Sequence, residues 1–370
     1  MRREFIIKKI AFVLFLVSTV SFGQHHEAPH AAHSEGHSAS EKGITKEYVK
    51  EFIGHHLLDT YDFGLYSYTD EAGHESHVGF PLPVILWDKA SGLHVFSSSK
   101  FHHATTVAES NGAYFKVFHN KVYVTDAEGA IQMDEHHHAT NAKPLDFSVT
   151  KNVFVIFIVC VLMFFIFTRM AKSYQKSALP SGFGRLMEPI ILYIRDDIAI
   201  PNIGKKHYRK YMSYLLTVFF FVWIINLLGL TPLGVNVTNN IAVTFALSFI
   251  TYLLTTFTAN KSYWGHIFWM PGVPTPMKFL LAPIELLGTF IKPFSLMIRL
   301  YANITAGHIV LMSILGMVFI FKNWIGSPLS FGLAFALSLL ELLVAALQAY
   351  IFTMLSALYF GSAVEEHDDH

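Results

Sequence analysis

Five long runs of apolar residues occupy the C-terminal part of the chain and predict membrane-spanning helices. The first three runs, Val149 to Thr168, Tyr211 to Leu230 and Ile241 to Phe257, are close to the ~20 residues that a helix needs to cross a bilayer. The fourth, Phe279 to Phe321, has 43 residues, and the fifth, Leu329 to Phe360, has 32. As helices these are about 65 and 48 Å long, against a hydrocarbon core of about 30 Å. The pattern therefore predicts two strongly tilted helices, or broken ones, at the end of the chain.

The fourth run has an arginine near its middle. Arg299 lies 20 residues from Phe279 and 22 from Phe321, where insertion scales give a charge a cost of about 2.5 to 3.5 kcal/mol. Its guanidinium keeps its proton at any accessible pH, so it is a permanent charge and not a proton carrier. At 100° per residue, Asn303 and Glu285 fall within about 40° of Arg299, whereas His308 falls about 180° away. The alternative interpretation is an arginine that reaches an interface or is neutralised by an internal carboxylate.

The fifth run carries polar residues of its own. Glu341, Gln348 and Tyr359 recur at seven and eleven residues, within about 20° of one another on a helix. The two long apolar helices are therefore each expected to carry a polar stripe.

These residues carry a resemblance to a known family. The pattern from Ser295 to Asn303, SLMIRLYAN, followed by LQAYIF from Leu347 to Phe352, resembles subunit a of the F-type ATP synthase, the stator channel protein of its membrane sector. The likeness covers roughly 150 to 367. It implies an all-α polytopic membrane protein whose last two helices form a steeply tilted hairpin against the rotating c-ring. It also implies that Arg299 faces the c-ring and that Gln348 supports it.

One departure from the family pattern is informative. Many bacterial members carry a glutamate nine residues after the arginine and a histidine seven residues before the glutamine, whereas this chain has His308 and Glu341 at those places. The exchange keeps one acid and one imidazole together if the two positions touch. The resemblance implies that His308, Glu341 and Asn303 line a periplasmic half-channel. It places Glu285 with Ser295 in a cytoplasmic one and Tyr359 near the cytoplasmic exit.

The same resemblance sets the expected partners. They are the c-ring of subunit c, peripheral-stalk subunit b and membrane lipid, with no cofactor. The chain has no G-x-x-x-x-G-K-[ST] loop that would bind a nucleotide. We therefore expect no catalytic site on this chain and expect ATP chemistry in partner subunits. A secondary transporter would tend to show inverted repeats, and a metal redox enzyme would need several histidines inside the spans, where His308 stands alone. The transported ion, proton by default or sodium, stays open, because the c subunit largely sets it.

The first 43 residues have the patterns of a targeting segment followed by a His-rich tract. Residues 1–23 have a basic start, an apolar core and a small-residue ending, which predicts a cleaved signal peptide or, alternatively, an uncleaved anchor. Residues 24–43 form a His-rich tract that is expected to be disordered. Histidine pairs and triplets at His25, His102 and His136 raise the alternative of transient metal binding.

Residues 44–147 are predicted to form a small periplasmic α+β domain of unknown role. Lys46 to Leu58 has the pattern of an amphipathic helix, and alternating segments predict short strands. The strands are Pro83 to Trp87, Leu93 to Phe96, Tyr114 to Phe118 and Lys121 to Val124, with a turn at Asn120 and Lys121.

Charge and composition agree with this division. The formal net charge is zero with 52% hydrophobic residues, so nothing suggests nucleic-acid binding. Nine Lys or Arg residues lie between Arg169 and Lys210 and none between Thr231 and Asn240, which puts the first of these loops in the cytoplasm. The chain is therefore expected in a bacterial inner membrane, with a periplasmic N-terminus, a channel domain over 148–361 and a cytoplasmic tail over 362–370. Four asparagines either form hydrogen bonds at the membrane interface or line an aqueous entrance: Asn226, Asn236, Asn239 and Asn240.

Overall fold

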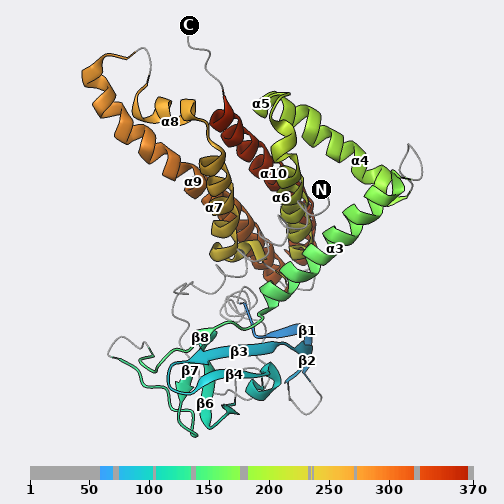
Figure 1. The fold of residues 1–370 in the computed structure, drawn as a ribbon. Coiled ribbons are helices and arrows are strands. Elements are labelled where there is room, and N and C mark those ends of the chain that lie inside the picture. Colours follow the sequence, from blue (N-terminus) through green and yellow to red (C-terminus); the bar gives the residue numbers. More distant parts are fainter. Residues whose placement is uncertain are drawn as a thin grey trace.

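The computed structural model describes residues 59–69, 75–102, 106–134, 139–175, 182–231, 235, 237–270, 273–320 and 326–365. It has two parts, a β-rich N-terminal extension and a group of long helices that begins with α3 (Figure 1). The signal peptide, the His-rich tract and the amphipathic helix predicted at Lys46 to Leu58 lie outside the described residues.

Two small antiparallel sheets form the core of the extension. One has the order β4-β3-β8, from Gly92–Ser97, Pro83–Asp88 and Leu145–Asp146. The other has the order β5-β6-β7, from Ala108–Ser110, Ala113–Phe118 and Lys121–Thr125. Both sheets contribute to one hydrophobic core, which includes Leu86, Phe96 and Phe115, and the short 3-10 helix η1 (Ser98–Phe101) adds Phe101.

A longer antiparallel pair, β1 (Asp62–Thr69) and β2 (Glu75–Pro81), joins the extension to the helices. Phe63 of β1 and Phe80 of β2 stack on each other, and both lie edge-on to Phe154 of α3 (Lys151–Ser173) at 5.7 and 5.3 Å between ring centres. The Lys151 amide donates to the Thr60 carbonyl. The extension is thereby fixed to the first turn of α3.

Four predicted strands match β3, β4, β6 and β7. The predicted turn is wrong by one residue: Phe118 pairs with Lys121, so the two-residue turn is His119 with Asn120. Both have positive φ, 47° and 60°, as a type I′ hairpin turn requires. The other four strands, β1, β2, β5 and β8, were not predicted. β5 and β8 are short, β2 begins in a polar stretch, and β1 lacks a clear alternation of apolar and polar residues.

Five helices in the described part of the chain are long and apolar enough to cross a membrane. They are α3, α6 (Tyr208–Gly229), α7 (Ile241–Thr258), α9 (Thr275–Ile320) and α10 (Gly326–Val364). The five predicted spans are confirmed within a few residues at most ends. The first span continues five residues past its predicted end, and α9 starts four residues before its own.

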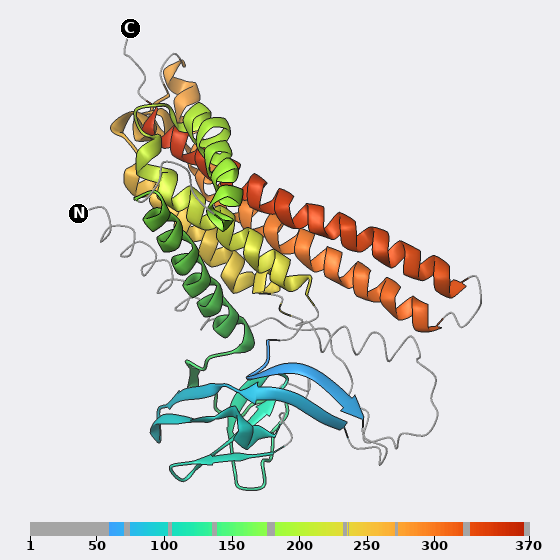
Figure 2. The same ribbon diagram turned by 90° about the vertical axis from the view of Figure 1, so that its right-hand side faces the viewer.

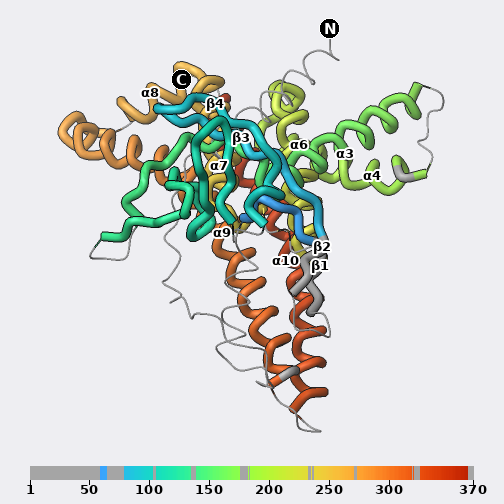
Figure 3. Tube along the Cα trace, turned by 90° about the horizontal axis from the view of Figure 1, so that it is seen from below, coloured from blue at the N-terminus to red at the C-terminus, as the bar shows by residue number. Residues whose placement is uncertain are grey.

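The last two helices form a long hairpin. α9 has 46 residues and α10 has 39, about 69 and 58 Å at the usual rise. Pro283 and Pro293 lie inside α9 without ending it, so the excess length is carried by unbroken helices. Figure 2 shows the hairpin extending well beyond α6 and α7, and Figure 3 shows its two helices side by side and inclined to the others.

The segment predicted as a loop between the first two spans is largely helical. It contains α4 (Phe183–Tyr193), a π-helical stretch (Ile194–Ala199) and α5 (Ile200–Ile203). Ile194, Ile198 and Ile203 are buried in the main core beside α6 and α10. The loop between α7 and α9 contains α8 (Lys261–Phe268), and Asn260, which precedes it, donates hydrogen bonds to the carbonyls of Ala363 and Val364 at the end of α10.

The contact between α5 and α10 depends on Gly361. A Cβ atom there would collide with the carbonyl oxygen of Asn202 on α5. Alanine normally favours a helix interior by about 1 kcal/mol over glycine, but here the backbone must move. We expect Gly361→Ala to destabilise the folded chain by about 1 to 3 kcal/mol, measured as a lower temperature of thermal aggregation in purified membranes.

Gly332 provides the matched control for this prediction. It lies on the same helix, and a Cβ atom added there would meet open space. Gly332→Ala should therefore leave the aggregation temperature unchanged or raise it slightly. Equal behaviour of the two variants would contradict the close approach of α5 to α10.

Candidate functional site

The pairing of α9 with α10 brings the predicted polar residues into register. His308 Nδ1 lies 3.4 Å from Glu341 Oε1, and Lys292 Nζ lies 5.6 Å from the centre of the Tyr359 ring. Residues of the two antiparallel helices therefore lie level when their numbers sum to about 650. This register places Gln348 level with residue 301 or 302, within one turn of Arg299.

Arg299 lies on the uncovered side of the hairpin. It is exposed, as are Ser295 and Asn303 on the same face, and so are the neighbouring apolar side chains Phe294 and Ile298. Among the residues that the structure describes, ion pairs join Arg195 to Asp196 and His308 to Glu341, and neither pair includes Arg299. A permanent positive charge thus stands on an apolar membrane helix with no described carboxylate beside it.

His308 and Glu341 form a buried acid–imidazole pair, each about 5% exposed. The two positions therefore touch, as the exchange of acid and imidazole between the helices requires. Gly307 allows the close approach, since a Cβ atom there would lie 3.0 Å from Glu341 Oε1. Both carboxylate oxygens of Glu341 are buried without a hydrogen bond from the described protein atoms. Buried carboxyl groups normally have partners, so a proton or a bound water is needed to satisfy this one.

Asparagines near this pair connect α9 to the segment before α7. Thr305 of α9 donates a hydrogen bond to Asn239, which belongs to the 3-10 helix Val237–Asn239. Asn226 is buried at the end of α6, and its side-chain oxygen accepts a hydrogen bond from the Thr238 hydroxyl at 3.0 Å. Its amide nitrogen has no partner among the described atoms. Asn240 caps α7 through the Ala242 amide, so it is structural. Asn236 lies outside the described residues.

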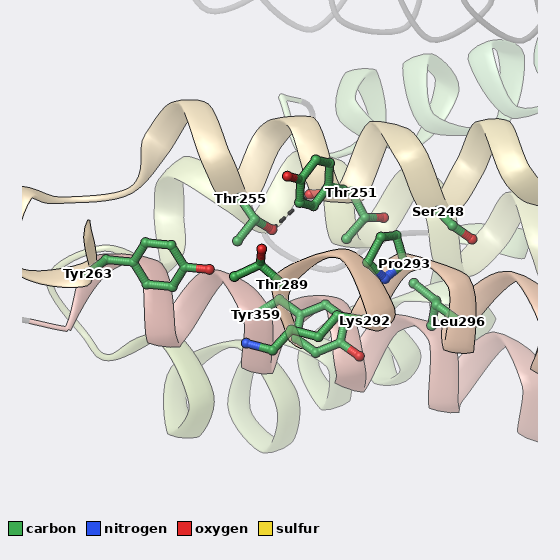
Figure 4. A pocket seen from close by; sticks show the side chains of 10 residues that line it. Ser248, Thr251, Thr255, Tyr263, Thr289, Lys292, Pro293, Leu296 and Tyr359 are labelled. Carbon is green, nitrogen blue, oxygen red and sulfur yellow. Dashed lines mark hydrogen bonds between the residues drawn. The ribbon is translucent and has the colours of Figure 1, made fainter. Parts of the chain in front are cut away.

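A second polar region is a small pocket between α7, α8, α9 and α10 (Figure 4). Its polar lining comprises Ser248, Thr251, Tyr252, Thr255, Tyr263, Thr289, Lys292 and Tyr359. Ser248 and Thr255 each donate to the carbonyl four residues earlier, so their oxygen lone pairs can still accept from water or a proton carrier. Of the predicted site residues, the pocket includes Tyr359.

Glu285 and Ser295 lie near this pocket but outside its lining. Glu285 is half-buried one turn before Thr289. Burial raises the pKa of Tyr263 in α8, and the charges of Tyr252 and Glu285 raise it further. Ser295 instead shares the exposed face of Arg299.

The sequence did not single out the serine and threonine residues of the pocket. Ser248, Thr251 and Thr255 recur at three and four residues in the third apolar run, together with Thr244, and Thr258 follows the run directly. That spacing keeps them on one side of a helix. A search for small hydroxyl residues at helical spacing would have found them.

The two polar regions lie on opposite sides of Arg299 along α9. Lys292 precedes it by about 10 Å of helix and His308 follows it by about 14 Å. No described group of three His, Cys, Asp or Glu side chains has the arrangement of a metal site. Most of the histidine clusters considered for metal binding fall outside the described ranges.

Comparison with known proteins decides the family. The family model described as ATP synthase A chain matches residues 153–361, a stretch that contains both polar regions and Arg299. The chain belongs to the ATP synthase A chain family. A second model, described as Domain of unknown function (DUF8433), matches residues 52–147.

Individual relatives agree with this assignment. The chain is 42% identical over 231 residues to ATP synthase subunit a of Chloroherpeton thalassium, a match that covers 61% of this chain and 69% of the relative. It is 43% identical over 234 residues to ATP synthase subunit a 2 of Chlorobaculum tepidum, covering 61% and 66%. The subunit a of Myxococcus xanthus is 38% identical over 233 residues, covering 61% and 77%.

Membership in the ATP synthase A chain family gives the general role. The chain is subunit a of an F-type ATP synthase, the proton-channel stator subunit, and a multi-pass protein of the membrane that holds the complex. The sequence-based prediction of the family and of the fold class is confirmed.

Proposed function

We propose that Arg299 separates two offset half-channels and faces the carboxylates of a c-ring. The observation that carries this proposal is the exposed arginine on an apolar helix face, between a buried acid–imidazole pair and a hydroxyl-lined pocket. A charge on such a face is expensive in lipid. A partner that brings an anion to the face removes that cost.

The proposed mechanism follows from the energetics of the ring carboxylate. Facing lipid, the carboxylate must be protonated, because an ion there is costly. Facing Arg299 it can ionise, because the guanidinium compensates its charge. A proton enters through one half-channel, moves with the ring and leaves through the other. Arg299 prevents direct passage between the two, and Gln348, within a turn, holds the guanidinium in place.

We assign the half-channels to the two polar regions. His308, Glu341 and Asn303 belong to the one on the side of the N-terminal extension, with Asn239 and Thr305 at its edge. The pocket with Tyr359 belongs to the other, with Glu285 at its mouth and Ser295 between the pocket and Arg299. Each proton that crosses 100 mV releases about 2.3 kcal/mol to the rotor. The transported ion in this assignment is the proton.

The orientation and partners are part of the same proposal. The excess of Lys and Arg between Arg169 and Lys210 supports a cytoplasmic position for α4 and α5, a periplasmic extension over 44–147 and a cytoplasmic C-terminal end. The tail predicted over 362–370 is shorter than expected, because α10 continues to Val364. Residues 1–23 are a signal peptide and 24–43 a His-rich tract in this assignment. A peripheral-stalk subunit b holds the chain against the torque of the ring, and the catalytic sites for ATP are on other subunits.

Sided thiol labelling tests the two half-channels. In a Cys160→Ala background, Thr289→Cys in the pocket should react with a membrane-impermeant thiol reagent mainly in inverted vesicles. Thr305→Cys, beside Asn239, should react mainly in right-side-out vesicles. Water must reach each position from one side only, so the expected ratio of rates is at least about tenfold for each.

Ala345→Cys serves as the control, because Ala345 is buried in α10 and should react slowly from both sides. Labelling of Thr289→Cys and Thr305→Cys from the same side would rule out offset half-channels.

A further inference from the structure

The serine and threonine hydroxyls of the pocket between α7, α8, α9 and α10 offer it hydrogen-bond acceptors. Ser248 and Thr255 donate their hydrogens to carbonyls one turn earlier in α7, both at 2.8 Å. Thr289 donates to the Leu286 carbonyl in α9 at 2.7 Å. A hydroxyl has one hydrogen and two lone pairs, so these three oxygens are left with lone pairs. Such a lining favours an occupant that carries positive charge.

Two more groups strengthen this preference. The Tyr359 ring lines the pocket, and the face of an aromatic ring attracts cations. Glu285 lies one turn before Thr289, and its charge acts on Tyr263 of the pocket lining. Figure 4 shows the hydroxyls of Thr255, Tyr263 and Thr289 directed into the same space. Because oxygen lone pairs replace the hydration shell of K⁺ in selective channels, the pocket has the chemistry of a site for a monovalent metal cation.

The protein places a cation of its own in this pocket. Lys292 belongs to the lining, and its Nζ lies 5.6 Å from the centre of the Tyr359 ring (Figure 4). The ion pairs between described residues, Arg195 with Asp196 and His308 with Glu341, do not include Lys292. No described carboxylate therefore neutralises the ammonium at close range, and its charge acts on whatever enters the pocket.

The position of Lys292 along α9 puts it on the way to the arginine. It lies seven residues after Glu285 and seven before Arg299, so the three side chains follow one another at two-turn intervals of about 10 Å on one side of the helix. A cation drawn in by the carboxylate of Glu285 meets the ammonium of Lys292 before it can approach Arg299.

We propose that the ammonium of Lys292 takes the place of a metal cation in this pocket and keeps Na⁺ and K⁺ out of it. Like charges a few Å apart repel strongly where water is scarce. A metal ion has to reside among the pocket oxygens, whereas a proton passes by exchange of hydrogen bonds along water and lone pairs. The ammonium therefore excludes metal ions more strongly than protons. The benefit for proton transport rests on the half-channel assignment proposed above, but the exclusion of metal ions does not.

A cationic and a neutral thiol reagent test the exclusion in the intact ATP synthase. In a Cys160→Ala background, Thr289→Cys places a thiol in the pocket, and its rates of reaction with Ag⁺ and with iodoacetamide are compared. Lys292→Met should raise the ratio of the Ag⁺ rate to the iodoacetamide rate about tenfold or more, because the repelling charge is gone. The ratio cancels changes in space and in the reactivity of the thiol itself.

Two control variants accompany this measurement. Lys292→Arg keeps the positive charge and should keep the ratio of the parent. Lys278→Met removes a lysine of the same helix that does not line the pocket and should also leave the ratio unchanged. An unchanged ratio in Lys292→Met would overturn the proposal.

Proton pumping measures the consequence of the exclusion. ATP-driven pumping by Lys292→Met in inverted vesicles should be about twofold or more slower in potassium or sodium salts than in the choline salt, because metal ions now occupy the pocket. Wild type should pump equally in all three. A raised reagent ratio with pumping that does not respond to K⁺ or Na⁺ would support the exclusion of metal ions and contradict the assignment of the pocket to a half-channel.

Discussion

Arg299→Ala is expected to abolish ATP-driven proton pumping while the complex still assembles. Without the guanidinium, a ring carboxylate that ionises at the interface has no opposite charge, and an unpaired buried charge costs about 3 kcal/mol or more. That corresponds to a loss of at least about a hundredfold in rate. The measurement is acidification of inverted vesicles on addition of ATP, with the amount of assembled complex determined in the same membranes.

Two variants sharpen this test. Arg299→Lys keeps the charge but replaces a planar guanidinium by a compact ammonium with different reach and hydrogen-bond geometry, so it too should pump poorly. Ile298→Ala changes an exposed apolar neighbour on the same helix and should pump nearly normally. Normal pumping by Arg299→Ala would refute the proposed role of the arginine.

His308 and Glu341 are expected to act as one unit in passive proton flux. They are buried and 3.4 Å apart, so removal of either leaves the other without its partner at a cost of about 1 to 3 kcal/mol. Each single alanine variant, and each single swap, His308→Glu or Glu341→His, should lower the flux about tenfold. The double swap restores one acid and one imidazole and should recover a substantial part of that loss.

The measurement for the pair is proton conductance through membranes from which the catalytic head has been stripped. Wild type, the two single swaps and the double swap are compared at equal amounts of assembled membrane sector. If the losses simply add, so that the double swap is worse than either single swap, the two residues do not share a site.

The sequence predicted the membrane helices well because a bilayer demands length and apolarity, and both are visible without a structure. Helical geometry also predicted that His308 faces away from Arg299. In the structure, that is the side on which His308 meets Glu341. The extra length of α9 and α10 likewise predicted two helices too long to cross the bilayer upright, and the family resemblance implied that they form a hairpin.

Other features depend on packing and could not be read from the pattern. The segment with Ile194 and Ile198 becomes helical where it fills a gap between α6 and α10, although its charges gave it the appearance of a loop. The pocket combines hydroxyl groups from α7 with residues of three other helices, and a threonine in an apolar run gives no sign of what it faces. For Asn240 the sequence left open whether it forms an interfacial hydrogen bond or lines an aqueous entrance, and in the structure its side chain accepts from the Ala242 amide as a helix cap.

Cysteine cross-linking to the ring tests the central claim most directly. Ile298→Cys and Ala302→Cys flank Arg299 on the exposed face of α9, and Phe165→Cys lies exposed on α3. Each is paired, in a Cys160→Ala background, with a cysteine next to the ring carboxylate of subunit c. If Arg299 faces that carboxylate, mild oxidation in intact membranes will join both α9 positions to subunit c and leave Phe165→Cys uncoupled. Failure of both α9 positions to cross-link, or cross-linking of Phe165→Cys in their place, would contradict the account.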